Sequence, residues 1–220
     1  MRIAVTGGSG AIGRYVCDEL ANAGYQVVSI DRTPPPDGID YVEADLRELE
    51  QCVRALTNFD QVVHLAAIPD PYYDPPVEVI TVNTAINFGV FEAIRLNGIP
   101  CVIYGCSDSS TGFGLRMAET YAKAYGIEAL SLRYNWVWVK RWQEKAAKTV
   151  ADARAGNFDK TTAWLGGYIS VRDVARAVLA AARYQFPAEQ ALRYEAFFFT
   201  AANTNYSIPT LDLLQAIYGE

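Results

Sequence analysis

The stretch that decides the fold is Arg2–Gly13, which reads RIAVTGGSGAIG. The apolar run Arg2–Thr6 is followed directly by glycines at positions 7, 10 and 13. Such a loop needs glycine where the turn is tight, where the backbone approaches a pyrophosphate and where the helix meets the sheet. The N-terminus of the following helix then supplies N–H groups for the phosphates. The spacing predicts a dinucleotide-binding loop made by Gly7, Gly10, Ala11, Ile12 and Gly13; a glycine-rich turn without a ligand is the alternative.

The second predicted strand, Gln26–Ile30, ends at Asp31, which lies at about the ~20-residue offset expected for a ribose-binding acid. A carboxylate there accepts hydrogen bonds from both ribose hydroxyls and repels a 2′-phosphate, so Asp31 favours NAD over NADP. Arg32 keeps NADP binding possible, because a guanidinium can take a 2′-phosphate. A solvated surface charge is the alternative role for Arg32.

The composition predicts a single globular domain spanning residues 1–220, since domains usually have roughly 100–200 residues. Hydrophobic residues make up 51% of the chain, enough to bury a sizeable core. The net charge is −6, and no Lys/Arg cluster could neutralise a row of phosphates, so nucleic acid is not an expected partner. The one histidine, His64, and four cysteines without a CxxC pair predict no metal site and reduced, mostly buried thiols.

The sequence also predicts a cytoplasmic location. No apolar run reaches the ~18 residues of a membrane helix. The N-terminus enters a strand pattern directly, without the apolar stretch and cleavage site of a signal peptide.

Short apolar runs alternate with amphipathic stretches of helix length, which indicates βαβ units on a parallel sheet. The predicted fold is a doubly wound α/β, Rossmann-type parallel sheet of about seven strands. A small substrate-side lobe is expected from residues 134–170 and 185–220. The predicted strands are Arg2–Thr6, Gln26–Ile30, Tyr41–Val42, Gln61–Leu65, Cys101–Tyr104, Ala129–Leu132 and Phe197–Phe199. The predicted helices are Ala11–Ala23, Arg47–Leu56, Pro76–Asn97, Leu115–Tyr125, Gln143–Ala155, Val171–Ala182 and Pro209–Ile217.

Several further motifs occur in order along the chain: TGGSGAIG at 6–13, Asp45-Leu46, HLAA at 64–67, Asn83 within VNTAINFGVFEA, Leu132-Arg133, and YISVRDVA at 168–175. Together they resemble the extended short-chain dehydrogenase/reductase family, the NAD-dependent sugar epimerases and dehydratases. The resemblance implies that Asp45, Leu46, Leu65, Ala66, Ala67 and Asn83 also line the cofactor site. Taken singly, each has a structural alternative: Asp45 as a helix N-cap, His64 as a satisfied core histidine and Asn83 as a residue that bonds loop backbone.

The resemblance breaks at the catalytic residues. The family uses a Ser/Thr after the fifth strand, a Tyr as general acid/base, and a Lys four residues later that lowers the tyrosine pKa. Ser107 matches the first position, but Glu119 aligns Thr111 with the Tyr and Leu115 with the Lys. Either the chain has lost the catalytic pair, or residues near Thr111–Arg116 are missing from the sequence. Tyr104, Tyr121 and Tyr125 are the candidate substitutes, with ordinary core or interface packing as the alternative.

The segment LRYNWVW, at 132–138, resembles the family's LRxxNVxG, whose asparagine contacts substrate. The resemblance implies that Asn135, Trp136, Arg141 and Arg172 face the substrate; Trp138 and Trp164 add further aromatic surface. Indole faces stack on sugar rings and guanidinium groups pair with carboxylate or phosphate, so this set suits a sugar carrying an anionic group. A packed lobe with partly buried arginines is the alternative.

The expected function is that of an NAD-dependent epimerase/dehydratase-type oxidoreductase acting on a sugar, uronate or nucleotide sugar. The alternative is a catalytically silent NAD(H)-binding sensor or scaffold, which the Thr111/Leu115 pair favours. The resemblance further implies a homodimer formed through the helices near 76–97 and 115–125.

Overall fold

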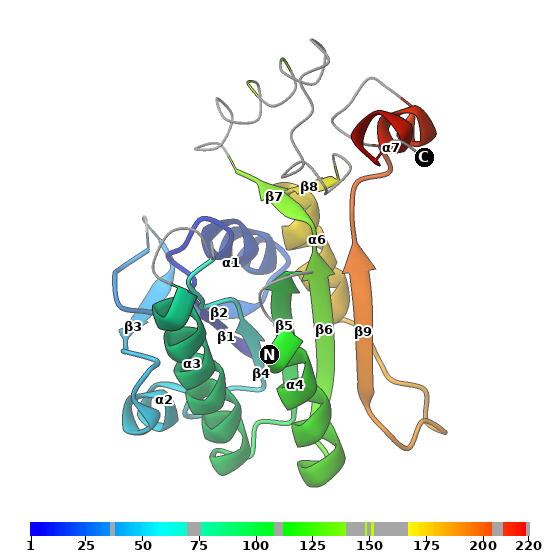
Figure 1. Cartoon of the computed structure of the whole chain (residues 1–220). Helices are drawn as coiled ribbons and strands as arrows, with labels where there is room; N and C mark the ends of the chain where they lie inside the picture. The colour runs from blue at the N-terminus through cyan, green and yellow to red at the C-terminus, as the bar shows by residue number, and fades with distance from the viewer. Residues whose placement is uncertain are drawn as a thin grey trace.

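The main sheet has seven parallel strands in the order β3-β2-β1-β4-β5-β6-β9 (Figure 1). The computed structural model describes residues 1–35, 38–69, 76–107, 112–139, 148, 151, 167–203 and 209–218. The strands are β1 (Arg2–Thr6), β2 (Gln26–Asp31), β3 (Asp40–Glu43), β4 (Gln61–His64), β5 (Cys101–Ser107), β6 (Glu128–Tyr134) and β9 (Tyr194–Phe199). A second, two-stranded parallel sheet joins β7 (Trp136–Trp138) to β8 (Tyr168–Ser170).

Helices cover both faces of the main sheet. The helices of the described residues are α1 (Gly13–Asn22), α2 (Leu49–Ala55), α3 (Pro76–Leu96), α4 (Gly112–Tyr125), α6 (Val171–Ala182) and α7 (Thr210–Tyr218), of which all but α7 lie against the main sheet. Figure 1 shows α1 and α6 on one face and α2, α3 and α4 on the other. Each face has its own buried apolar cluster, one including Leu20 and Val178, the other including Leu56 and Phe91. Burial on both faces explains why the central strands are continuously apolar, as at Ile3–Val5.

The structure confirms the predicted fold class and all seven predicted strands. It extends most of them: β5, predicted to end at Tyr104, continues to Ser107. Helix α1 begins at Gly13 instead of Ala11, so the glycine loop is longer than predicted. Strands β7 and β8 were not predicted. The predicted helix Gln143–Ala155 lies outside the described residues except for 148 and 151.

Within the segment 185–220, expected to belong to the substrate-side lobe, β9 joins the main sheet by pairing with β6. Helix α7 lies beyond the carboxyl end of β9, and the β7–β8 sheet lies beyond the carboxyl end of β6 (Figure 1). These elements lie where a substrate-side lobe is predicted, and both the lobe and its role in binding substrate stay predictions.

Val77–Leu96 of α3 is long and apolar enough to cross a membrane by length and composition alone. The sequence had predicted no uninterrupted apolar run of membrane length. The segment contains three charged residues, Glu78, Glu92 and Arg95, among mainly apolar ones. One side of this helix is buried against the sheet and includes Val90, Phe91 and Ile94. Two buried asparagines on the helix are hydrogen-bonded to other parts of the fold, which is the arrangement of a core helix.

All four cysteines are free thiols; Cys17, Cys52 and Cys106 are buried and Cys101 is partly exposed. Burial raises the pKa of the Cys17 and Cys52 thiols to about 12, so both stay protonated at neutral pH. The prediction of reduced, mostly buried thiols is confirmed.

Candidate cofactor and active site

The glycine loop between β1 and α1 is built so tightly that side chains are excluded from it. Gly7 has φ +72°, and a Cβ on it would lie 2.9 Å from the backbone of Ala66. A Cβ on Gly13 would lie 2.0 Å from the Gly7 carbonyl oxygen. Gly7 and Gly13 are therefore required for the loop itself. The close approach also brings the loop against the segment that follows β4.

Gly10 is different, because a Cβ there would meet only the Gly7 carbonyl oxygen, at 3.0 Å. The Gly10 N–H donates to that same oxygen, at 3.0 Å, and closes the turn. Helix α1 then starts from Ile12 with no side-chain cap and no acidic residue in its first turn. An uncapped helix N-terminus with a small residue in front of it suits a pyrophosphate, so the chain fits this part of a dinucleotide.

Asp31 lies at the carboxyl end of β2, beside the glycine loop. The Ser9 N–H donates to its Oδ2 (3.2 Å) and the Arg32 N–H donates to its Oδ1 (2.7 Å). These contacts aim the carboxylate at the loop while leaving it partly exposed. Lone pairs remain on both oxygens for ribose hydroxyls. The Arg32 side chain is exposed next to it.

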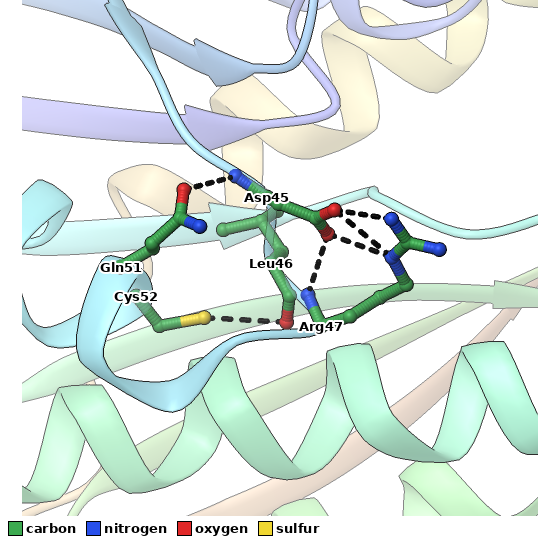
Figure 2. Close-up of polar contacts among 5 residues, drawn as sticks. All are labelled: Asp45, Leu46, Arg47, Gln51 and Cys52. Atoms are coloured by element: carbon green, nitrogen blue, oxygen red, sulfur yellow. Dashed lines mark hydrogen bonds and ion pairs between the residues drawn. The ribbon is translucent and has the colours of Figure 1, made fainter.

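Asp45 follows β3, the neighbour of β2, and is held by Arg47 (Figure 2). The Arg47 guanidinium forms an ion pair with the Asp45 carboxylate, and the Arg47 N–H donates to Asp45 Oδ1 at 3.0 Å. These contacts lower the pKa of Asp45 to about 2. Asp45 does not cap the next helix, because α2 begins after Glu48. Instead the Asp45 N–H donates to Gln51 Oε1 at 2.9 Å, and the carbonyl of buried Leu46 accepts from the Cys52 thiol at 3.2 Å.

His64 ends β4 as a fully buried, neutral side chain. Its Nδ1 is 2.7 Å from Thr6 Oγ1 and its Nε2 is 3.0 Å from Asn87 Oδ1. Burial lowers the pKa of His64 to about 4. The structural alternative, a satisfied core histidine, is therefore correct. Thr6 Oγ1 also accepts from the N–H groups of Leu65 and Ala66, which fixes the start of the segment beside the glycine loop.

Asn83 of α3 holds the same segment from the other side. Its Oδ1 accepts from the Ile68 N–H at 2.7 Å, and its Nδ2 donates to the Ile68 carbonyl at 3.1 Å. Both ends of the amide are thus engaged with loop backbone, the structural alternative given above. Asn83 positions the residues Leu65–Ile68. Within the described structure its contribution to the cofactor site is therefore indirect, through this segment.

Ser107 ends β5 and pairs with Tyr134 of β6 in the parallel register. Thr111 lies outside the described residues. Leu115 of α4, at the position of the family lysine, packs against the apolar cluster under α2–α4, and its carbonyl accepts from Tyr194 Oη at 3.5 Å. A partly buried leucine supplies no charge, so this position cannot lower the pKa of a tyrosine.

The three candidate tyrosines lie in different surroundings, and a part in catalysis stays a prediction for each. Tyr104 is 3% exposed, and its hydroxyl would lie 2.0 Å from a Cβ on Gly114 of α4. Tyr121 donates to Glu92 Oε2 at 3.0 Å, and burial raises its pKa to about 12. Tyr125 is exposed at the far end of α4, next to the amino edge of the sheet.

Sequence reasoning missed Tyr134, which lies next to Ser107 only because of the strand register. Its ring packs near Gly105 and Leu65. In the described part of the chain its buried hydroxyl has no hydrogen-bond partner. Burial raises the pKa of Tyr134 well above its usual value, so this hydroxyl can donate a hydrogen bond but cannot act as a base at neutral pH. Pairing β5 with β6 at full length would have been the signal that revealed it.

The predicted substrate residues are only partly together. Asn135 and Trp136 directly follow β6, whereas Arg172 is exposed on the first turn of α6, and Arg141 and Trp164 lie outside the described residues. The Asn135 amide donates to Thr200 Oγ1 at 3.0 Å and so ties the ends of β6 and β9. Counted residue by residue, the pattern LRxxN places its asparagine at Trp136, one residue beyond Asn135.

Taken together, the candidate residues follow six adjacent strands at one edge of the sheet. Asp45 follows β3, Asp31 ends β2, the glycine loop follows β1, Leu65–Ala67 follow β4, Ser107 ends β5, and Asn135 follows β6. In a doubly wound parallel sheet the carboxyl edge is where ligands bind. The fold and the glycine loop define a dinucleotide-binding protein of the Rossmann type.

The chain belongs to the NAD-dependent epimerase/dehydratase family, whose model matches residues 3–114, about half of the chain. NAD is the cofactor that this membership assigns. The match ends within the first turn of α4, where the sequence departs from the family's Tyr–Lys pattern.

Among curated relatives, the L-arabinose 1-dehydrogenase (NAD(P)(+)) of Haloferax volcanii is 29% identical over 175 residues, which cover 62% of this chain and 67% of the relative. The UDP-glucose 4-epimerase of Bacillus subtilis is 32% identical over 139 residues, covering 52% of this chain and 38% of the relative. The chain thus spans well under half of that epimerase.

Solved structures show the same fold. A UDP-galactose 4-epimerase superposes with a TM-score of 0.74 at 24% identity, covering 98% of this chain and 81% of that chain. MoeE5, solved in complex with UDP-glucuronic acid and NAD, superposes with a TM-score of 0.75 at 20% identity, covering 100% of this chain and 83% of that chain.

Proposed function

We propose that NAD lies along the carboxyl edge of the sheet, with its pyrophosphate over Gly10–Ile12 and its adenosine ribose at Asp31. The uncapped N-terminus of α1 and the space at Gly10 support the first contact. The partly exposed carboxylate beside the loop supports the second. Asp45 and Leu46, on the next strand out, are then the residues for the adenine.

On this placement the nicotinamide end lies towards Leu65–Ala67 and Ser107. The function that the site supports best is that of an epimerase/dehydratase-type oxidoreductase acting on a sugar, uronate or nucleotide sugar. NAD, when bound, would supply the acceptor for hydride from a substrate carbinol carbon, and in its reduced form the donor to a substrate carbonyl carbon. Ser107 holds the substrate oxygen, and Asn135, Trp136, Arg141 and Arg172 contribute to the substrate side. The observation that carries this proposal is the row of candidate residues on adjacent strand ends, in which Ser107 ends β5.

The names of the relatives support the substrate class. They include an arabinose dehydrogenase and a UDP-glucose epimerase, both of which act on sugars in free or nucleotide-linked form. The family membership supports the reaction type.

A second candidate function, an NAD-binding sensor or scaffold without chemistry, is favoured by one observation. Leu115, a partly buried apolar residue, lies where the family places its lysine, and the tyrosines Tyr104, Tyr121 and Tyr134 are buried. A protein of this kind keeps the whole cofactor site and lacks the proton-transfer group.

The deciding experiment measures cofactor binding and chemistry separately. Thermal unfolding with and without NAD tests binding. Chemistry is tested with free aldoses, uronates and nucleotide sugars by two readouts: net NADH formation for a dehydrogenase, and conversion of the sugar to its epimer or dehydrated product for a reaction that regenerates NAD. Binding with turnover supports the oxidoreductase, and binding without turnover supports the sensor. Absence of NAD binding contradicts both. An intact-mass measurement on the same protein shows whether residues near Thr111–Arg116 are missing from the sequence.

The proposed assembly is a homodimer through α3 and α4, and the proposed location is the cytoplasm. Val77, Ile80 and Phe88 form an exposed apolar stripe on α3, and Phe113 is exposed on α4. The two helices lie side by side, as the bond from Tyr121 to Glu92 shows. A paired apolar surface of this kind suits burial against a second copy.

A further inference from the structure

The small β7–β8 sheet presents its aromatic residues on one face. Val137 and Ile169 pack into the cluster under α1 and α6. Because side chains alternate along a strand, the neighbours Trp136 and Trp138 face the opposite way. Their rings meet edge to face at 5.8 Å, and the Trp138 ring stacks on Tyr168 at 4.5 Å. These three residues form an aromatic cluster, Trp136–Trp138–Tyr168.

This cluster is anchored to the end of the main sheet. Tyr168 Oη donates to Asn203 Oδ1 at 3.0 Å, and the Tyr168 carbonyl accepts from the Ala201 N–H at 2.7 Å. The ladder between β7 and β8 pairs Trp136 with Tyr168 directly. Trp136 therefore stands on a fixed support, which lowers the conformational entropy lost when a ligand binds to it.

The cluster also lies near the predicted catalytic residue. Ser107 pairs with Tyr134, and Trp136 is two residues further along the same chain direction. Two residues of chain span at most about 7 Å, so the Trp136 backbone lies within about 7 Å of Tyr134, the residue in register with Ser107, and outside the edge of the main sheet. Trp136 is partly exposed there, whereas a core tryptophan would be sealed.

We propose that Trp136, supported by Trp138 and Tyr168, is the stacking platform for the sugar ring of the substrate. The proposal rests on the proposed function and deepens it, since it names the substrate as a pyranose or furanose and names the surface that receives the ring. One face of such a ring carries C–H groups and packs on an indole, while its hydroxyls stay available to polar groups such as Ser107. The ring belongs either to a free aldose or to a nucleotide sugar.

The test is a calorimetric titration with L-arabinose, UDP-glucose and UDP, each with and without saturating NAD. We expect wild-type protein to bind L-arabinose, UDP-glucose or both. Trp136→Leu should weaken that binding about three- to tenfold, the range expected for one aromatic contact. Trp136→Phe, which keeps an aromatic face, should retain most of the affinity. Tyr184→Ala, an exposed aromatic beyond the end of α6, is the control and should change nothing.

The titrations distinguish a free aldose from a nucleotide sugar as the source of the ring, and they define the results that would overturn the proposal. Binding of L-arabinose identifies a free aldose, and binding of UDP-glucose above that of UDP identifies a nucleotide sugar. The proposal is overturned if neither sugar binds, if Trp136→Leu leaves affinity unchanged, if Trp136→Phe loses as much as Trp136→Leu, or if UDP alone accounts for the effect. NAD affinity, measured on the same variants, should not change. Loss of NAD binding in the wild type would instead contradict the proposed function, and the titrations without NAD still decide the role of Trp136.

Discussion

Asp31 is the residue on which cofactor choice depends. Asp31→Ala should weaken NAD binding by at least tenfold, because it removes a charged acceptor for two hydroxyls, each bond worth ~1.5–3 kcal/mol. NADP binding should stay the same or improve, because the carboxylate no longer repels a 2′-phosphate. Titration of both cofactors against the variant and the wild type measures this.

Arg32→Ala is the matched control for that variant, since Arg32 is the adjacent residue and its side chain is exposed. We expect it to leave NAD affinity unchanged. Unchanged NAD affinity in Asp31→Ala would show that the ribose lies elsewhere.

His64 makes the stability of the protein depend on pH in a window that no other residue type explains. It is the only histidine, and its pKa in the folded chain is about 4, against 6.5 as the ordinary value. Below pH 6.5 the unfolded chain binds a proton that the folded chain does not. The free energy of unfolding should therefore fall as the pH drops from 6.5 towards 4, by roughly 1.4 kcal/mol per pH unit at most.

Denaturant titrations at pH 6.5 and pH 5 measure this slope above the range where most carboxylates titrate. The variant His64→Gln should be less stable overall, because it disturbs the bonds to Thr6 and Asn87, and it should lose the dependence on pH between those two values. A wild-type protein equally stable at both pH values would contradict a buried neutral His64.

At the scale of elements, two glycines of the loop between β1 and α1 should have different roles, one in NAD binding and the other in the stability of the fold. Gly10→Val should abolish NAD binding with little loss of stability, since its Cβ meets only the Gly7 carbonyl and its methyl groups take the space of the pyrophosphate. Gly13→Ala should instead destabilise the fold, because its Cβ would lie 2.0 Å from that oxygen. Thermal unfolding of both variants, with and without NAD, measures the two effects. NAD-induced stabilisation of Gly10→Val would show that the loop is not the site.

The main sheet could be predicted from the sequence because its strands are short apolar runs separated by amphipathic helices. Gly24 and Gly98 follow the ends of α1 and α3 with positive φ angles, a position where glycine commonly ends a helix. Strands β7 and β8 escaped prediction because each has three residues and they pair across about thirty intervening residues. Nothing local in sequence signals such a pairing.

The candidate site was predictable where one residue's type defines its role, as at Asp31 and the glycines. It was not predictable where the role depends on a partner. Arg47 binds Asp45 and Ile68 binds Asn83, and neither contact follows from a motif. Strand β5 ends at Ser107, and β6 begins 21 positions later in the sequence, at Glu128. Only the register between these two strands brings Tyr134 beside Ser107.

At the scale of the whole molecule, the exposed stripe on α3 predicts self-association. Ile80 is 68% exposed, so Ile80→Glu should leave the fold intact and shift a dimer to monomers, because a charge at the centre of an apolar interface is left unpaired. Sedimentation velocity measures the change. Leu211→Glu, an equally exposed apolar position on α7, is the control and should not alter the assembly. A wild-type protein that is monomeric at high concentration would contradict the proposed interface.

The last prediction concerns turnover by protein whose intact mass is first checked against the sequence of 220 residues. Leu115 occupies the position of the family lysine, so this position supplies no charge to lower a tyrosine pKa beside Ser107, and a tyrosine of pKa ~10 is ionised about one part in a thousand at pH 7. General acid/base catalysis is worth ~10²–10⁴-fold, so hydride transfer should be slower than in a competent relative by at least that factor. NAD binding should remain intact, because the glycine loop and Asp31 do not depend on α4.

NADH formation and conversion of the sugar substrate, both followed over a range of pH and measured beside NAD binding, test this expectation. Steady turnover at ordinary enzyme rates, ~1–10³ s⁻¹, would mean that another group moves the proton. Tyr104→Phe and Tyr134→Phe then identify it, since each keeps its ring packing and removes only the hydroxyl. Of the two, Tyr134 lies in register with Ser107, but its raised pKa allows it only to donate a hydrogen bond near neutral pH. Activity that depended on Tyr134 would therefore require the bound cofactor or substrate to lower that pKa, and the rate should then rise with pH.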